Sequence, residues 1–467
     1  MGNRVKGRSR GTLLLVRTRV IRLGVVLLLS LAFPVSLFPR SPVFLFSPVP
    51  LLPFSPLPPI ASRDSPVVST ATREGRLAVF DDAWGRINER YYDRTFHGLD
   101  WDAQRTAFRS LAGDANSDQE FYAVLRRMIA RLNDPHTRVF SPDEKFDWWR
   151  PRFVTTGVRV AEVEGQPTVV QLERGSVPQR VGIRVGDVIE TVNGVPALSL
   201  IKDRLEKFTE PARASTRFRV FAKLLDGPVD APVDVVWRSK DGKQKSARFE
   251  RRWQQRELGV RVKAKGEFVV VEIEVFTKPI AATFARSLRE KIGRARGVIL
   301  DLRSNGGGDA EAMTDVASTF LGAGLNLGQF TDRDGSSFTI STHSRSLFAP
   351  DQITQIKLPL VVLTSERTSS ASEIFVEALK LSERATIIGT ETCGCVLAVR
   401  NRHLLPDGGV LDVSEMDYET AQGARLEGHG LKPDETVLPG RGDLYAGRDR
   451  ALELALTKLS RLSTAHR

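Results

Sequence analysis

Cysteine is almost absent from this chain of 467 residues: there are two, and both lie in the turn Cys393-Gly394-Cys395. Two thiols cannot build a disulfide framework, and without other ligands they are too few for a closed zinc site. They could close a small ring with each other or pair elsewhere. A redox or other functional role for this turn therefore stays open.

Acidic residues are missing from the first 62 positions, which carry eight lysines and arginines. These eight charges make up most of the formal net charge of +12. The rest of the chain has no dense basic stripe interleaved with aromatic side chains, so a nucleic-acid partner is not expected. The remaining composition is that of an ordinary globular protein of about two to three domains.

An uninterrupted apolar run long enough to span a membrane is also missing here. Residues 23–38 are apolar, but this stretch has only 16 residues and contains Pro34, which makes it short for a spanning helix. Basic residues before an apolar core are typical of an export signal. Residues 1–62 are therefore predicted to be an export signal, or a Pro-rich leader or anchor, and the protein to be periplasmic or secreted. Membrane association through this segment, or a leader without a targeting role, are the alternatives.

Residues 75–150 are predicted to form a helical module, because apolar side chains recur there at helical spacing. Ser117 or the next residue would cap the second long helix, with Glu120 completing a Ser-x-x-Glu capping box. Pro135 ends the helical pattern and leaves His136 on a turn. A histidine in such a place is more often solvated than functional.

Residues 153–253 change to short alternating strands joined by glycine turns, with a hairpin signal at Asp241-Gly242. Within them, residues 175–194 closely resemble the second half of a PDZ domain: a small helix, a Val-Gly-Asp turn, and a strand that ends in Asn-Gly. PDZ domains capture extended C-terminal peptides by strand addition and hold the terminal carboxylate on backbone N–H groups. The resemblance implies that the peptide-binding residues are Gly157, Val158 and Arg159. A β-rich domain used only for packing is the alternative.

Residues 256–463 alternate strands with helices, which favours an α/β layer. The apolar runs at 298–300 and 360–363 suit strands that are buried on both faces. An amphipathic helix from 448 to 459 would cover the sheet.

Two strand-to-helix turns in this region carry residues suited to chemistry. Ser370 opens a helix after a buried strand, where free N–H groups and the helix dipole can stabilise an oxyanion. Ser370-x-x-Glu373 also fits a capping box, so the serine could be purely structural. Gly306-Gly307-Gly308 permits the close backbone approach of an oxyanion hole or phosphate cradle, or simply a tight turn. No Gly-Lys-Ser/Thr follows, so a phosphate-binding loop is excluded.

Taken together, these motifs closely resemble the carboxyl-terminal processing (tail-specific) serine protease family. The matching stretches, in the family's order, are residues 134–137, 175–194, 301–308, 370–373, 384–389 and 427–434. The resemblance implies a helical N-terminal module, an inserted PDZ domain and an α/β protease core. It also implies that Ser370 is the nucleophile, with the backbone N–H groups of Gly307 and Ala371 as the oxyanion hole.

The catalytic base is where the sequence departs from many family members. They use a Ser–Lys dyad, and the position that matches the lysine, 25 residues after Ser370, is Cys395 here. A lysine mechanism is therefore excluded at this position. A second branch, similar to the tricorn core, uses a Ser–His–Glu arrangement, which His136 and Glu427 match. An imidazole would then take the serine proton, and the carboxylate would fix its tautomer.

The sequence thus predicts an exported serine endopeptidase that grips substrate C-termini with a PDZ domain and cleaves through an acyl-enzyme. Its partners would be proteins or peptides with free C-termini, and no metal or organic cofactor is required. The alternative is a catalytically inactive pseudoprotease that serves as a PDZ peptide-binding scaffold, since Cys395 replaces the usual lysine.

Overall fold

The computed structural model describes residues 68–144, 152–206, 214–255, 258–347 and 355–465. The predicted export signal at residues 1–62 lies outside these ranges. Within them, none of the helices combines the length and the apolar character that crossing a lipid bilayer requires.

Three helices begin the described chain, α1 (Arg73–Arg90), α2 (Trp101–Gly113) and α3 (Asp118–Ile129), with short 3-10 turns at Phe96–Gly98, Ala130–Leu132 and Pro142–Glu144. Ser117 caps α3, because its Oγ accepts a hydrogen bond from the Glu120 N–H at 3.1 Å. The second hydrogen bond of a standard capping box, from the N–H of the capping serine to the glutamate side chain, is replaced here. The Glu120 carboxylate accepts from the N–H of Asn116 at 2.8 Å rather than from Ser117.

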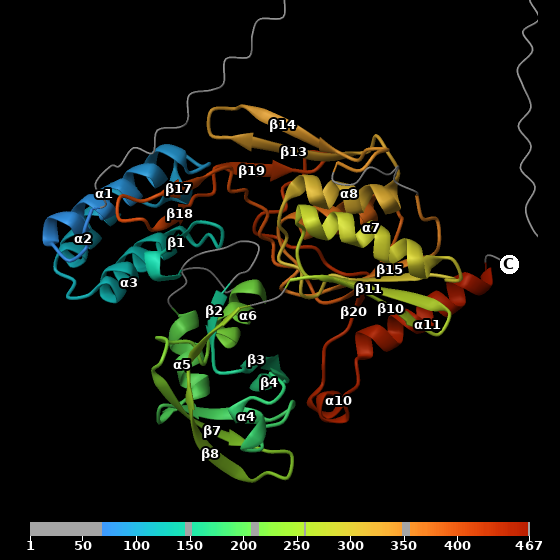
Figure 1. Ribbon diagram of the computed structural model, residues 1–467, viewed down its shortest axis with the longest axis horizontal. Coiled ribbons are helices and arrows are strands. Elements are labelled where there is room, and N and C mark those ends of the chain that lie inside the picture. The colour runs from blue at the N-terminus through green and yellow to red at the C-terminus, as the bar shows by residue number, and fades with distance from the viewer. Residues whose placement is uncertain (1–67, 145–151, 207–213, 256–257, 348–354, 466–467) are drawn as a thin grey trace, which may run out of the picture. The chain divides into compact units, whose positions relative to one another are not determined.

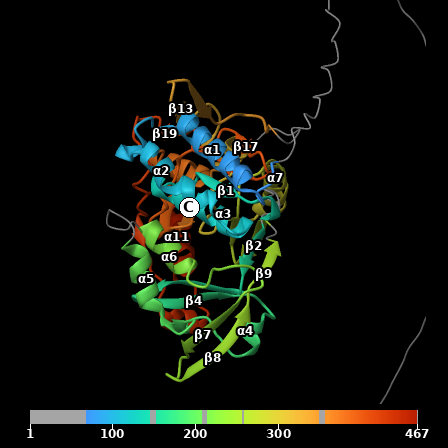
Figure 2. The ribbon, with the colours of Figure 1, turned by 90° about the vertical axis from the view of Figure 1, so that its left-hand side faces the viewer.

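A small antiparallel sheet joins these helices to the last third of the chain. Strand β1 (Arg138–Phe140) pairs with β18 (Val410–Asp412), and β17 (Arg402–Leu404) pairs with the other edge of β18. The two ribbon views place β1 and β17 against α1 and α3 (Figures 1 and 2). One hydrophobic core contains residues from both parts of the chain: Val79, Phe80, Phe121, Leu125, Leu411 and Val413. The β1–β18–β17 sheet therefore fixes the segment that follows His136.

The segment from 152 to 255, here called the β-rich segment, has a five-stranded path in the order β3-β4-β5-β7-β8. Its strands are β2 (Arg152–Thr155), β3 (Val158–Val163), β4 (Gln166–Leu172), β5 (Val188–Val192), β6 (Val195–Pro196), β7 (Pro232–Arg238), β8 (Gln244–Glu250) and β9 (Arg252–Gln255), and its helices are α4 (Val177–Arg180), α5 (Ala197–Leu205) and α6 (Ala214–Ala222). β2 pairs with β9, and β6 pairs with β5. The predicted hairpin turn joins β7 to β8, with Gly242 at φ +79°.

The larger sheet of the C-terminal half has the order β10-β11-β12-β15-β16-β20, parallel except for the edge strand β10. Its strands are β10 (Val260–Lys265), β11 (Phe268–Ile273), β12 (Val298–Asp301), β15 (Leu360–Thr364), β16 (Thr386–Gly389) and β20 (Glu435–Thr436). The helices α7 (Lys278–Ile292), α8 (Ala310–Leu321) and α9 (Ala371–Leu381) contribute to the core on one face, and α11 (Arg450–Ala465) covers the other (Figure 1).

Alternate residues of the central strands enter different cores, as the period of two in a strand requires. Leu360 and Val362 belong to the core that contains α7, α8 and α9, whereas Val361 and Leu363 pack with Ala455 and Leu459 of α11. The predicted burial of these strands on both faces is confirmed. The final helix begins at Arg450 and runs further than expected, to Ala465.

Two further elements complete the described chain. A three-stranded antiparallel sheet contains β13 (Asn326–Asp332), β14 (Ser337–Ser341) and β19 (Met416–Glu419). The short helix α10 (Arg441–Ala446) contacts the β-rich segment. Tyr445 Oη donates to Asp187 Oδ1 at 3.1 Å, and Arg441 Nε donates to the carbonyl of Gly186 at 3.2 Å.

Candidate active site

Two turns meet at the carboxyl ends of the neighbouring parallel strands β12 and β15. Ends of adjacent parallel strands lie at one edge of a sheet, where active sites of α/β folds are found. Hydrogen bonds join the turns: the Ser369 N–H donates to the carbonyl of Asn305 at 3.2 Å, and Thr368 Oγ1 donates to the carbonyl of Leu302 at 2.9 Å. The turn that contains Gly306-Gly307-Gly308, here called the glycine turn, and the turn that leads into Ser370, here called the serine turn, are therefore held together.

Ser370 occupies an unusual backbone conformation at the start of α9. Its φ is +56° and its ψ is −128°, a region that a residue with a side chain rarely adopts. Such strain persists only where the surroundings hold it, and it clusters at functional sites. Two acceptors hold the Ser370 N–H, the carbonyl of Cys395 at 2.7 Å and Glu373 Oε2 at 3.1 Å.

Gly307 lies directly against this serine. A Cβ added to Gly307 would lie 2.6 Å from Ser370 Cβ and 3.0 Å from the Ala371 nitrogen, and its φ of +90° also favours glycine. Ala371 is the first residue of α9, so its N–H has no acceptor within the helix. The Gly307 N–H donates to Asn305 Oδ1 at 2.9 Å. The structure thus brings both residues of the predicted oxyanion hole to Ser370, with one of the two donors engaged by Asn305.

Replacing Gly307 by alanine should damage the site far more than the same change next to it. Gly307→Ala places a methyl group against Ser370 at a positive φ, so we expect kcat to fall by at least about 10²-fold, the loss typical of one oxyanion donor. Gly306→Ala is the matched control, because the nearest atom to its added Cβ is Ser369 Oγ at 3.8 Å. Steady-state kinetics of both variants provide the comparison, and equal rates would show that the contact with Ser370 does not matter.

Glu373 is a buried carboxyl group beside Ser370, and sequence reasoning had treated it only as a capping residue. It accepts hydrogen bonds from the N–H groups of Ser370, Gly394 and Cys395 and from the hydroxyl of Thr392. Burial raises the pKa of Glu373 to about 7, although these hydrogen bonds oppose the shift. The Ser-x-x-Glu spacing indicated the contact between Glu373 and Ser370, but it does not predict the hydrogen bonds from Thr392, Gly394 and Cys395.

The cysteine turn packs between Ser370 and the predicted acid. Cys393 and Cys395 form a disulfide with each other, which answers the question of their pairing. Just beyond it, the N–H groups of Val396 and Leu397 donate to Glu427 Oε2 at 2.7 and 3.3 Å. Burial raises the pKa of Glu427, opposed by the positive charge of His136 and by these N–H groups.

His136 lies on the turn between α3 and β1, beside a carboxylate that sequence reasoning had not assigned a role. Asp134 Oδ1 accepts from the backbone N–H of His136 at 2.8 Å and lies 3.6 Å from His136 Nδ1. Asp134 Oδ2 accepts from Thr137 Oγ1 and Ser414 Oγ, both at 2.5 Å. Burial alone would raise the pKa of Asp134, but His136 and the two hydroxyl groups outweigh it and lower the pKa to about 2.

The predicted catalytic residues are thus only partly joined. Among the described residues, no hydrogen bond links the His136 ring to Ser370 Oγ and no ion pair links it to Glu427, and His136 Nδ1 is buried without a hydrogen-bond partner. Asp134 is the carboxylate paired with His136. In the same described ranges, no cluster of three or more His, Cys, Asp and Glu side chains is arranged to hold a metal ion.

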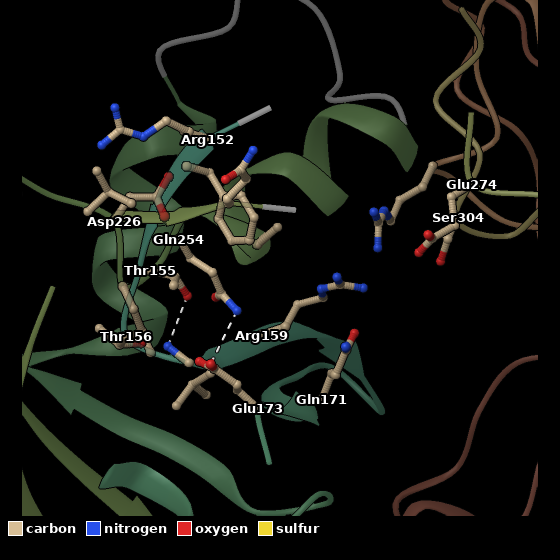
Figure 3. Close-up of a pocket in the computed structure, with 18 of the residues that line it drawn as sticks. Arg152, Thr155, Thr156, Arg159, Gln171, Glu173, Asp226, Gln254, Glu274 and Ser304 are labelled. Carbon is tan, nitrogen blue, oxygen red and sulfur yellow. Dashed lines mark hydrogen bonds between the residues drawn. The ribbon is translucent and has the colours of Figure 1, made fainter. Parts of the chain in front are cut away.

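The three predicted peptide-binding residues, Gly157, Val158 and Arg159, line a pocket of about 700 Å³. Its other wall comes from the C-terminal half and includes Ser304 and Arg367. Figure 3 shows Arg159 and Glu173 on one side of this pocket and Ser304 on the opposite side. Ser304 precedes the glycine turn and Arg367 precedes Ser370, so the pocket borders both turns of the site.

Two protein-family models match the chain. The model of peptidase family S41 covers residues 267–437, which include Gly307, Ser370 and Glu427, and the model of the tricorn protease C1 domain covers residues 73–130, the region of α1 to α3. The chain carries a peptidase domain of family S41. It is therefore a serine-type peptidase, a hydrolase of peptide bonds.

The chain is also similar to named relatives and, in its fold, to solved structures. The carboxyl-terminal-processing protease of Synechocystis is 26% identical over 386 residues, 80% of this chain and 83% of that protein. Carboxyl-terminal-processing peptidase 2, chloroplastic, of Arabidopsis thaliana is 27% identical over 402 residues, 81% of this chain and 72% of that protein. The structure of mature CPAF complexed with lactacystin has a TM-score of 0.61 at 15% identity and covers 84% of this chain and 98% of its own. At that identity the likeness shows a shared fold of mixed helices and sheets.

Proposed function

We propose that this S41 peptidase is an exported serine endopeptidase that processes or degrades proteins from their C-termini. Several relatives are named carboxyl-terminal-processing proteases, and some of them chloroplastic, which supports both the substrate end and a location outside the cytoplasm. In this proposal residues 1–62 direct export, 75–150 form a helical module, 153–253 a PDZ-like domain and 256–463 the protease core.

Ser370 is the proposed nucleophile, and its conformation carries the proposal: it stands at positive φ at the N-terminus of α9, against the backbone of Gly307. Its hydroxyl would attack the scissile carbonyl, and the negative oxygen would be stabilised by the N–H groups of Gly307 and Ala371. The Gly307 N–H would have to turn from Asn305 towards that oxygen. Collapse of the tetrahedral intermediate would release the amine and leave an acyl-enzyme, which water then hydrolyses.

His136 is the proposed base, which takes the Ser370 proton and returns it to the leaving amine. Glu427 is proposed to orient it, and its place supports this: Glu427 binds the N–H groups of Val396 and Leu397, next to Cys395, whose carbonyl accepts from the Ser370 N–H. The ionised Asp134 beside Nδ1 would share in stabilising the imidazolium. Catalytic hydrogen bonds in free enzymes are often long and tighten when substrate binds, which accounts for the separated residues.

The β-rich segment is the proposed anchor for substrate C-termini, through Gly157, Val158 and Arg159. Support comes from their place in a pocket that borders the serine turn. Because backbone N–H groups would hold a carboxylate, amidation of the substrate's C-terminus should raise KM about tenfold, a typical loss for one charged hydrogen bond, and leave kcat nearly unchanged. Kinetics on an unstructured peptide in its free-acid and amide forms provide the measurement. Equal KM values for the two forms would argue against carboxylate capture while leaving the assignment of Ser370 intact.

A further inference from the structure

We propose that the Cys393–Cys395 disulfide is a thiol-sensitive device that positions the nucleophile, so that its reduction converts the peptidase to a state of low activity. This inference rests on the proposed role of Ser370. Its basis is the set of hydrogen bonds between the bridged turn and the residues of the active site.

The bridged turn contacts the nucleophile through its backbone. The carbonyl of Cys395 accepts from the Ser370 N–H at 2.7 Å, the shorter of the two bonds that hold this strained residue. The next two residues, Val396 and Leu397, donate their N–H groups to Glu427. Movement of Cys395 would therefore displace both the proposed nucleophile, Ser370, and the proposed acid, Glu427.

A second connection runs through the buried carboxyl group of Glu373. Gly394 and Cys395 donate their N–H groups to it at 2.7 and 2.9 Å, and the same carboxyl group accepts from the Ser370 N–H. The turn thus holds Ser370 both directly and through Glu373. If the turn moves, the carbonyl of Cys395 moves with it and Glu373 loses the hydrogen bonds from Gly394 and Cys395. Both acceptors of the Ser370 N–H are then no longer held in place.

The surroundings leave the turn little room. Cys395 is 4% exposed, and the carbonyl of Gly394 accepts from the Gly428 N–H at 2.8 Å. A Cβ on Gly394 would lie 2.6 Å from the Gly430 nitrogen. A disulfide holds two sulfur atoms about 2 Å apart, whereas unbonded atoms need roughly 3.5 Å or more. Two thiols in this ring of three residues would therefore push the backbone apart against Ser370 or against residues 428–430.

The chemical step is ordinary thiol–disulfide exchange with a dithiol as reductant. A thiolate of the dithiol attacks Cys393 Sγ, since Cys393 is half-buried and Cys395 is buried; the bond to Cys395 breaks, and Cys395 takes up a proton. The second thiol of the reductant then displaces Cys393 and closes its own disulfide. The protein gains two electrons and two protons, and the dithiol is oxidised by the same amount.

The test compares the full-length protein in its oxidised and dithiothreitol-reduced forms. The chain has no other cysteine, so two alkyl groups added by mass confirm complete reduction. We expect reduction to lower kcat about 10²-fold, the scale of loss for a displacement of about 1 Å, to change KM little, and to be reversed by reoxidation. The double variant Cys393→Ser/Cys395→Ser should have the kcat of the reduced protein, and dithiothreitol should not change it. A fully reduced enzyme with unchanged kcat would overturn the proposal, as would a double variant as active as the oxidised protein.

Amide hydrogen exchange provides a readout that does not need turnover. Reduction should speed exchange at Ser370, Cys395 and Val396 at least about tenfold while leaving α11 unchanged; unaltered exchange overturns the inference. Failure of the proposed function would look different, because the oxidised protein itself would be inactive and unlabelled by a fluorophosphonate probe. If the double variant does not fold, the reversible reduction of the native chain and its exchange pattern decide the matter.

Discussion

Ser370→Ala is expected to lower kcat by at least about 10⁴-fold, because removal of the nucleophile of such a site abolishes the acyl-enzyme route and leaves only binding and oxyanion stabilisation. Labelling by a fluorophosphonate probe should disappear with it. The fold should survive, since the backbone of residue 370 keeps its hydrogen bonds: its N–H donates to Cys395 and Glu373, and its carbonyl accepts from the Glu373 N–H at 2.8 Å. Kinetics, probe labelling and a thermal melt on the same preparation provide the measurements.

Ser372→Ala is the matched control for this change. Ser372 lies two residues further along α9, and its Oγ is buried with no hydrogen-bond partner among the described residues. Loss of this hydroxyl should therefore leave kcat within about twofold, as is usual for removing an unpaired group. Full activity in Ser370→Ala would place the nucleophile elsewhere, and an inactive wild-type protein that still binds C-terminal peptides would favour the scaffold alternative.

His136→Gln should reduce kcat/KM by about 10³ to 10⁴-fold, near the upper range for loss of a general base. Glutamine retains the backbone N–H that donates to Asp134 Oδ1, so the turn should keep its shape. Steady-state kcat/KM of the variant and of the wild-type protein on the same unstructured substrate provides the measurement. Retention of activity within about tenfold would contradict the assignment of His136.

His429→Gln is the control for a general effect of removing an imidazole near the site. His429 is exposed and lies two residues after Glu427. The kcat/KM of this variant should equal that of the wild type. Comparing Asp134→Asn with Glu427→Gln then ranks the two carboxylates. The proposed role of Glu427 requires that its variant shows the larger fall in kcat, and the opposite order would make Asp134 the orienting group.

The parts of the fold that were predictable are those written in local patterns. The apolar runs at 298–300 and 360–363 gave the two central strands, because burial on both faces leaves no polar alternation. Asp241-Gly242 marked the β7–β8 hairpin, where Gly242 has the positive φ that such turns need. Since β12 and β15 pair in parallel, the turns after them had to meet.

The parts that could not be predicted depend on contacts between distant segments. The pairing of Arg138 with Asp412 joins residues more than 270 positions apart, and three-residue strands carry almost no periodic signal. The pairing of β19 with β13 is of the same kind, because it joins residues more than 80 positions apart, whereas the hairpin of β13 and β14 is local and was missed. The hydrogen bond from Ser414 to Asp134 belongs to this class of contacts, which is why the residue beside His136 was overlooked.

The contacts of Glu373 with the cysteine turn were missed for another reason, which is that one residue serves two purposes. A capping glutamate is a frequent local device, and nothing in its spacing says that the same carboxyl group will also bind Gly394 and Cys395. The absence of the usual lysine at position 395 was therefore the ground for the alternative of an inactive scaffold. The structure places a bridged turn in hydrogen-bond contact with Ser370, the proposed nucleophile.

The sheet formed by β1, β18 and β17 also makes assembly of the proposed site depend on the order in which the chain is synthesised. The turn that carries His136 is made early, but the hydroxyl of Ser414 that binds Asp134 and the strand that pairs with β1 emerge from the ribosome only after residue 410. A nascent chain that already contains Ser370 therefore still lacks the partner strand of its proposed base. Such a chain cannot assemble the proposed site before β18 and Ser414 have been translated, which delays the proposed activity relative to the synthesis of Ser370.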